Sequence, residues 1–153
     1  MRSEQAANAV VLAGSAALLG GALLFQYVGG LAPCEMCVWQ RWPHVAALAL
    51  GLVAWAIRSN RAVVALAALA VLVSAGLAVF HVGVEQQWWQ GVTACSASLA
   101  SGSQADILAS IMNTPLVRCD AVAWSLFGIS MAGWNAVLSF GIGGGALWLL
   151  GRR

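Results

Sequence analysis

The chain has 153 residues, enough for one domain, and 61% of them are hydrophobic whereas only 8% are charged. So few charges cannot cover a water-soluble surface, so the composition excludes an ordinary soluble domain and predicts an integral membrane protein. The formal net charge of +2 is too small to predict a nucleic-acid partner.

The first predicted span covers residues 8–28 and has Gln26 near its outer end. This stretch is long enough to cross about 30 Å of hydrocarbon as a helix. A cleaved signal peptide is the alternative, but the stretch exceeds a typical h-region and no clear small-x-small cleavage site precedes the cysteines. Small residues recur at every fourth position, which favours a packing face over a lipid-facing one; these are Ala9, Ala13, Ala17 and Gly21.

Cys34 and Cys37, separated by two residues, follow the first span. A disulfide between them would close a small and strained ring that is readily reduced, which indicates a redox centre. Cys37 and Arg41 would share a face if the next helix begins near Val38. A cation and a helix N-terminus both favour the thiolate, which is the reactive form of cysteine.

The second and third spans are predicted at residues 38–57 and 62–81. Pro43 lies near the start of the second span, and proline is tolerated in a first helical turn, so that helix could equally begin at Trp42. The short polar connection at residues 58–61 requires the two spans to be antiparallel neighbours.

Residues 82–123 are polar and irregular, which predicts a long loop. Within it, residues 104–113 place their apolar side chains on one helical face, which predicts a short helix. That helix would lie either on the bilayer surface or on the end of the bundle. A fourth span is predicted at residues 124–147, where the glycines at 141–145 lower helical stability.

The predicted fold class is an all-α membrane protein with one domain, residues 1–153, built as a four-transmembrane-helix bundle. Four spans place both termini on one side. That side carries most of the arginines, namely Arg2, Arg58, Arg61, Arg152 and Arg153, whereas the other side carries Arg41 and Arg118. The excess predicts cytoplasmic termini, and it predicts that the loops at 29–37 and 82–123 lie outside.

All four cysteines then fall on the outer side, where disulfides persist. Four cysteines can pair in three ways, and the spacing selects Cys34 with Cys37 and leaves Cys95 with Cys119. A zinc site is an alternative, but the second pair lacks the close spacing of structural sites, so no metal is predicted. The other alternative is a non-enzymatic tetraspan protein in which both disulfides brace the outer loops.

These features resemble the DsbB family of bacterial quinone-linked thiol oxidases. The resemblance rests on the stretch Pro33–Arg41, on Cys95 and on the run Cys119–Ser130. It covers nearly the whole chain, as far as Asn135. The residues Trp42-Pro43 depart from the family pattern and bear on how the second span enters the bilayer.

The resemblance implies a multi-pass protein of the bacterial inner (cytoplasmic) membrane. Such a protein reoxidises a periplasmic DsbA-like partner with a thioredoxin fold and passes the electrons to the membrane quinone pool. The partner would attack Cys95, and the released Cys119 would attack Cys34. Cys37 would then be freed as a thiolate that faces the quinone. The residues do not distinguish ubiquinone from menaquinone.

The resemblance also implies residues of the quinone site. Arg41 would stabilise both the Cys37 thiolate and the negative charge that develops on the quinone oxygen; the alternative is an arginine that reaches lipid phosphate. His81 resembles the histidine that family members place near the quinone, with Glu85 one turn beyond, although it could equally be a structural histidine. Four further polar residues of the spans are candidates independently of the resemblance. Gln26 and Gln40 are further quinone contacts, Asn135 is an interhelical hydrogen bond, and His44 could be either.

The vitamin K epoxide reductase group is the nearest enzymatic alternative, since it also combines several spans, a CxxC pair and a quinone. The order of the motifs favours the DsbB family. In this chain the CxxC pair opens the second span, and the second cysteine pair lies in a later loop.

Overall fold

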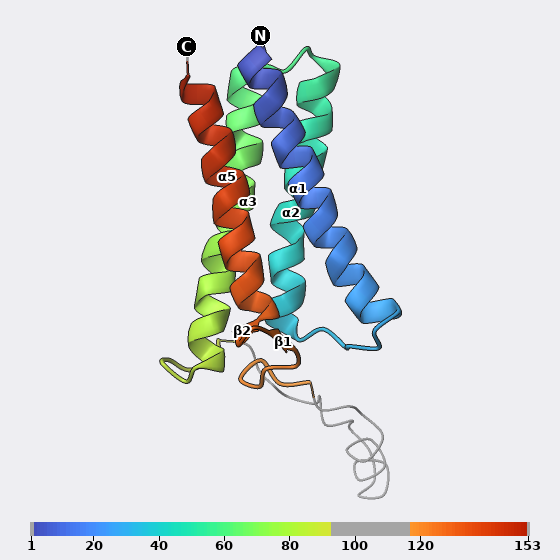
Figure 1. Ribbon diagram of the computed structural model, residues 1–153, viewed down its shortest axis with the longest axis vertical. Helices are drawn as coiled ribbons and strands as arrows, with labels where there is room; N and C mark the ends of the chain where they lie inside the picture. The colour runs from blue at the N-terminus through green and yellow to red at the C-terminus, as the bar shows by residue number, and fades with distance from the viewer. Residues whose placement is uncertain (1, 93–116, 153) are drawn as a thin grey trace, which may run out of the picture.

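The computed structural model describes residues 2–92 and 117–152, and helices dominate it (Figure 1). The elements are α1 (Arg2–Tyr27), α2 (Glu35–Ala56), α3 (Arg61–Glu85), β1 (Ser125–Leu126), β2 (Ile129–Ser130) and α5 (Met131–Gly151). Cys95 and the short helix predicted at residues 104–113 lie outside the described residues.

The four described helices run side by side, and the chain termini lie at the same end as the turn between α2 and α3 (Figure 1). We call this the terminal end. The antiparallel pair β1–β2 lies at the opposite end, which we call the hairpin end (Figure 1). The CxxC stretch, the start of α5 and the last turn of α3 meet at the hairpin end.

Small side chains form most of the bundle core. α3 packs most extensively against α5 and α2, and α1 packs against α2 and α5. Alanine and valine at these contacts let the helix backbones approach closely, as is usual between helices in a membrane. The core residues are Ala7, Val11, Ala47, Ala54, Val64, Ala67, Ala68, Val71, Ala146 and Leu150.

One glycine of the predicted glycine-rich patch makes a packing contact. A Cβ atom at Gly143 would lie 2.7 Å from Leu72 Cδ2 and 3.1 Å from the Ala68 carbonyl oxygen, so only glycine fits between α5 and α3 there. A Cβ atom at Gly141 or Gly144 would have nothing within 4 Å. The helical stability lost at Gly143 therefore permits a close contact between two helices.

Three of the described helices are long and apolar enough to cross a membrane, namely Ser3–Tyr27, Arg61–Glu85 and Met131–Gly151. α2 has comparable length but is not among them, because its first half contains Gln40, Arg41 and His44. The bundle is therefore mostly helical with three membrane-capable helices and a fourth helix packed beside them. A count of four spans stays a prediction.

α2 begins earlier than predicted. It starts at Glu35, directly after Cys34, rather than at Val38 or Trp42, and Pro43 lies in its interior. A cysteine side chain that caps the first turn explains the early start, as described below. α3 also exceeds its predicted range of 62–81 and continues to Glu85.

The helix predicted to begin at Trp124 begins at Met131 instead. Phe127 and Gly128 adopt positive φ angles of 53° and 77° in the turn between β1 and β2, and this left-handed conformation is incompatible with a continuous helix. Ser130 then caps α5, since its Oγ accepts a hydrogen bond from the Gly133 amide at 3.1 Å. α5 ends at Gly151, beyond the predicted end at 147.

The stripe of small residues on α1 does not form a buried helix contact, although Ala17 and Gly21 line a cavity described below. Ala9, Ala13 and Ala17 are exposed within this chain. The neighbouring face makes the contacts instead, and its buried residues are Ala7, Asn8, Val11 and Ser15. The prediction of a packing stripe was wrong, because the polar Asn8 and Ser15 mark the inner face more strongly than alanine spacing does.

Candidate functional site

The cysteine pair forms the first turn of α2. Cys34 is the N-cap residue, and its Sγ accepts a hydrogen bond from the Cys37 amide at 3.2 Å. The two Sγ atoms lie 2.8 Å apart, with the Cys34 thiol donating to Cys37. Because one helical turn holds both sulfurs in contact, a disulfide between them needs little backbone movement.

The hydrogen bond between the two sulfurs raises the pKa of one thiol and lowers the pKa of the other. The hydrogen bond that Cys34 donates lowers the pKa of Cys37 to about 7, with a smaller contribution in the same direction from the Arg41 guanidinium. The pKa of Cys34 is raised because its proton is held in that hydrogen bond and because the side chain is buried. Cys37 is therefore the sulfur that carries the negative charge near neutral pH.

His81 on α3 lies directly behind Cys34. Its Nε2 is 3.6 Å from Cys34 Sγ and 3.9 Å from Glu85 Oε1, whereas its Nδ1 is 2.8 Å from Gln40 Nε2. An amide nitrogen can only donate, so Nδ1 is the acceptor and the neutral ring carries its proton on Nε2. That proton points toward the sulfur of Cys34 and the carboxylate of Glu85.

Cys119 belongs to the same buried cluster. Cys34 and Cys119 are 5% and 2% exposed, and they pack with Met36 and Val84 at the hairpin end. One cysteine of the second predicted pair therefore reaches the first pair.

Arg41 lies one turn after Cys37 and joins α2 to α1. Its Nη1 donates to Gln26 Oε1 at 2.5 Å, and its Nη2 donates to the Ala22 carbonyl oxygen at 3.5 Å. These partners hold the half-buried guanidinium inside the bundle rather than among lipid phosphates. The alternative of an arginine that only reaches the membrane surface is therefore disfavoured.

A cavity of about 380 Å³ opens beside Cys37 between α1, α2 and α5. Its walls are mainly apolar, and Phe25 and Trp124 stand against each other at its edge with ring centroids 4.9 Å apart. Such a size and lining are typical of sites for small organic molecules. The polar side chains in its lining are Cys37, Gln40, Arg41, His44, His81 and Asn135.

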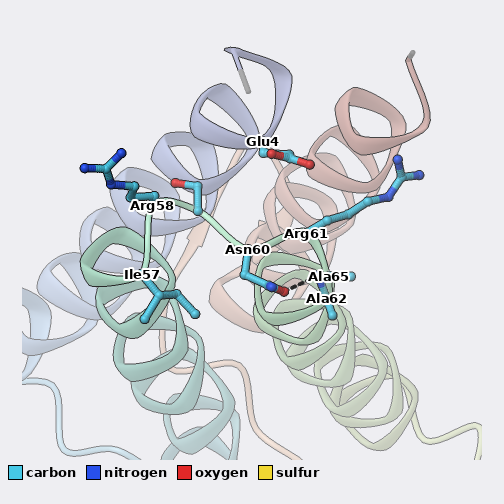
Figure 2. A pocket seen from close by; sticks show the side chains of 8 residues that line it. Glu4, Ile57, Arg58, Asn60, Arg61, Ala62 and Ala65 are labelled. Carbon is cyan, nitrogen blue, oxygen red and sulfur yellow. Dashed lines mark hydrogen bonds between the residues drawn. The ribbon is translucent and has the colours of Figure 1, made fainter.

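A second, more open hollow of about 660 Å³ lies at the terminal end, between α1 and the α2–α3 turn. Figure 2 shows Glu4, Arg58 and Arg61 around it, with Asn60 hydrogen-bonded to the amide of Ala62. Neither a cysteine nor a histidine is among the described residues that line it. The size of this hollow does not make it the reactive centre, because the chemistry lies at the hairpin end.

Cys34 Sγ, Cys37 Sγ and a ring nitrogen of His81 lie within 4.8 Å of one another. Two thiolates and an imidazole at this spacing are also ligands of the type that zinc prefers. The prediction that the chain holds no metal therefore stays a prediction.

The structure brings together four of the residues singled out from the sequence, namely Cys34, Cys37, Arg41 and His81, with Cys119 beside them. Cys95 lies outside the described residues. Sequence reasoning missed Ser74 and Ser130, two hydroxyls that bond to the site from α3 and from the start of α5. A serine inside an apolar run was the available signal, but it does not reveal its partner.

The chain matches the family model described as "Disulfide bond formation protein DsbB" over residues 4–149. Proteins named Disulfide bond formation protein B align with it over most of their length. That of Stutzerimonas stutzeri is 29% identical and covers 100% of this chain and 98% of its own length. Those of an Azoarcus species and Polaromonas naphthalenivorans are 33% and 34% identical, each covering 94% of this chain, and 90% and 89% of their own lengths.

No solved structure matches the chain significantly. The family model, however, covers nearly every described element, from the first turn of α1 to the last turn of α5. The apolar helices, the adjacent cysteines and these relatives agree on a membrane oxidoreductase. The chain belongs to the DsbB family of disulfide bond formation proteins.

Proposed function

We propose that the protein is a membrane thiol oxidase that transfers electrons from a periplasmic DsbA-like dithiol protein to a membrane quinone. The observation that carries this proposal is the position of Cys37. Its sulfur contacts Cys34 on one side and lines an apolar-walled cavity next to Arg41 on the other. A thiolate between a partner sulfur and a cavity is suited to pass electrons from one to the other.

The cavity fits a quinone head group by its chemistry. The apolar walls from α1 and α5 suit an aromatic ring, and the guanidinium of Arg41 is a donor for a ring oxygen. When bound, a quinone accepts two electrons and two protons and becomes a hydroquinone. Cys37, Gln40, Arg41, His44 and Asn135 would hold it, and exclusion of water by Phe25 and Trp124 would strengthen these polar contacts.

The electron path begins at the second cysteine pair. The partner dithiol attacks Cys95, a mixed disulfide forms, and Cys119 leaves as the free thiolate. The burial of Cys119 in one cluster with Cys34 supports the next step, in which Cys119 attacks Cys34. Cys37 is then the leaving group, and its low pKa makes it a good one. The second thiol of the partner then attacks the mixed disulfide and releases Cys95. Cys95 attacks Cys119, which re-forms the Cys95–Cys119 bond and leaves Cys34 and Cys37 as the reduced pair.

His81 and Arg41 both assist this exchange. The Nε2–H of His81 faces Cys34 Sγ, so the ring can donate a hydrogen bond that stabilises the Cys34 thiolate when that sulfur attacks to re-form the Cys34–Cys37 bond. Arg41 remains charged and favours the Cys37 thiolate that faces the cavity. The two electrons leave the pair from the Cys37 side.

The proposed setting is the bacterial inner membrane, with α2 as the fourth span and the hairpin end in the periplasm. Arg58, Arg61 and Arg152 lie at the terminal end, which supports a cytoplasmic location for that end. α2 packs against both α1 and α3, so two apolar helices cover the bundle side of its polar half. Its polar residues therefore face protein rather than lipid.

The test is a coupled assay with the purified protein, a reduced DsbA-like protein and a water-soluble ubiquinone analogue. We expect quinone reduction that depends on the dithiol partner. Cys37→Ser should lower the rate by at least about a hundredfold, because the sulfur that faces the cavity is lost. A variant such as Asn8→Ala, at a buried contact outside the cavity, should keep the rate. An unchanged rate in Cys37→Ser would exclude this function.

A further inference from the structure

A buried group of polar side chains crosses the middle of the bundle, one helical turn inward from Arg41. His44 of α2 is 3% exposed and lies at its centre. Each of the other described helices contributes at least one partner to it, namely Ser15 of α1, Ser74 of α3, and Asn135 and Ser139 of α5. We call this group the His44 cluster.

Two backbone carbonyls fix the direction of the hydrogen bonds next to this cluster. Gln40 Nε2 donates to the Met36 carbonyl oxygen at 3.1 Å and to His81 Nδ1 at 2.8 Å. Gln40 Oε1 is therefore the acceptor, and Asn135 Nδ2 donates to it at 2.8 Å. Asn135 must then present its own oxygen, Oδ1, to the cluster.

Ser74 is fixed in the same way. Its hydroxyl donates to the Gln40 carbonyl oxygen at 2.8 Å, so only lone pairs of Ser74 Oγ are left for other partners. His44 Nε2 faces three acceptors: Ser74 Oγ at 3.1 Å, Asn135 Oδ1 at 3.2 Å and Ser139 Oγ at 3.4 Å, whose own hydroxyl donates to Asn135 Oδ1. Nε2 therefore carries the proton of the neutral ring, and Nδ1 presents a lone pair.

Nδ1 of His44 already contacts a serine hydroxyl, but this contact is long enough for a ligand hydroxyl to replace it. Its polar contact among the described residues is Ser15 Oγ at 3.5 Å, which is at the outer limit of a hydrogen bond. His44 also lines the cavity beside Cys37. The inner end of the cavity thus offers an acceptor, whereas Arg41 at the outer end offers only donors.

We propose that the inner end of this cavity, at His44, is a hydroxyl-binding subsite that selects the reduced form of the electron carrier, a hydroquinone. This inference rests on the proposed function and concerns the same cavity. A hydroquinone hydroxyl donates a hydrogen bond to His44 Nδ1. A quinone carbonyl oxygen has only lone pairs, so it cannot form a hydrogen bond with the unprotonated His44 Nδ1.

The preference has a redox consequence. The dithiol of Cys34 and Cys37 and the quinone react to give the disulfide and the hydroquinone, so that two electrons and two protons move from the sulfurs to the ring. A site that binds the product ring more tightly than the reactant ring raises the reduction potential of the bound carrier. The His44 cluster would therefore make the bound carrier a stronger oxidant of the cysteine pair.

The test compares the affinities of a short-chain ubiquinone and its ubiquinol for the full-length protein with its cysteines oxidised, under anaerobic conditions. Trp124 and Trp134 line the cavity, so quenching of their fluorescence reports binding. We expect the ubiquinol to bind about tenfold more tightly than the ubiquinone, the size expected of one buried hydrogen bond. In His44→Phe, which keeps a ring but removes the acceptor, we expect the two affinities to be about equal.

The control is Asn8→Ala, which removes a buried hydrogen bond between α1 and α2 outside the cavity and should keep the preference. Equal affinities in the wild-type protein, measured without any variant, would overturn this inference while the proposed function stands. A preference that survives in His44→Phe would also overturn it. If neither ligand binds, the inference and the proposed function both fall.

Discussion

Cys34 and Cys37 occupy the same helical turn, yet the pKa values of their thiols are shifted in opposite directions. Cys34 donates its proton to the neighbouring sulfur and is buried, whereas Cys37 accepts that hydrogen bond. Arg41 acts in the same direction on Cys37 from the other side. The position of one proton therefore decides which of the two sulfurs is the thiolate.

The acidity of Cys37 can be measured by alkylation. In the reduced protein, we expect the rate at which iodoacetamide modifies Cys37 to rise with pH and to reach half its maximum near pH 7. The thiolate is the reactive form, so a lowered pKa moves the rise toward lower pH. Cys34→Ala removes the donated hydrogen bond and should move the midpoint up toward about 8.5, the ordinary value. Peptide mass spectrometry would measure the modification site by site.

Cys119→Ser is the matched control, because it changes another buried cysteine of the same cluster but leaves the bond from Cys34 in place. Its midpoint should stay near that of the wild-type protein. A wild-type midpoint near 8.5, or one that Cys34→Ala does not move, would contradict this account of the pair.

The sequence predicted the reactive cysteines and their arginine better than it predicted the residues that hold them in place by hydrogen bonds. The spacing of Cys34, Cys37 and Arg41 along one helix is visible in the sequence, and the structure keeps them together. The role of Gln40 is not visible, because it depends on Met36, His81 and Asn135 at once. Hydrogen bonds between helices require a register that sequence spacing within one helix does not contain.

At the scale of elements, Ser130 joins the start of α5 to the reactive end of α3. Its Oγ accepts the Gly133 amide as a helix cap and donates to Glu85 Oε2 at 2.5 Å. The β1–β2 turn places this serine beside Glu85, and so one hydroxyl couples a helix end to the site. The hairpin therefore positions α5 relative to the cysteine cluster.

Ser130→Ala should lower stability by about 1 kcal/mol through the lost cap. For a chain of this size, that corresponds to a fall in Tm of about 2–4 °C, measured by thermal unfolding in detergent. Asn60→Ala removes the comparable cap of α3 at the terminal end and serves as the control. Both variants should lose stability, but only Ser130→Ala should also lower the rate of thiol oxidation. If Ser130→Ala oxidises thiols at the same rate as Asn60→Ala, the bond between Ser130 and Glu85 does not contribute to the activity of the site.

Gly143→Ala tests the contact between α3 and α5. Its new methyl group would overlap Leu72 and the Ala68 carbonyl, so we expect a loss of about 1–3 kcal/mol in the free energy of unfolding. Gly144→Ala, one residue further on in open space, should instead raise it by about 0.5–1 kcal/mol. Denaturant unfolding in micelles measures both. Similar effects of the two substitutions would mean that the helices do not pack closely at Gly143.

The helices themselves were largely predictable, because long apolar runs separated by polar turns are a strong signal. Their ends were not. Because of the cap at Cys34, α2 begins earlier in the chain than predicted. Because of the turn at Phe127-Gly128, α5 begins later than predicted. Both boundaries depend on local hydrogen bonds and backbone angles that apolar length does not determine.

At the scale of the whole molecule, the two ends of the bundle differ in charge and chemistry. Arg58, Arg61 and Arg152 lie at the terminal end, and the described cysteines lie at the hairpin end. A membrane that separates these ends would keep the cysteines on the oxidising side. The proposed topology therefore follows from the same asymmetry that makes the disulfide chemistry workable.

Topology can be tested with two matched glutamine substitutions in a variant without native cysteines. Gln5→Cys places a thiol at the terminal end and Gln86→Cys places one at the hairpin end, and both positions are exposed. In intact spheroplasts, a membrane-impermeant maleimide should label Gln86→Cys and should label Gln5→Cys only after lysis. The reverse pattern would refute the proposed orientation.

The His44 cluster also bears on how the bundle is assembled during synthesis. The helices that emerge first carry His44, Gln40 and Ser74, but the amide of Asn135 that completes their hydrogen bonds arrives only with the last helix. Until then these side chains lie in the membrane with hydrogen-bonding atoms unpaired, which is unfavourable in hydrocarbon. A nascent chain interrupted before its final helix should therefore be recognised by membrane quality control, whereas insertion of that helix completes a protease-resistant protein.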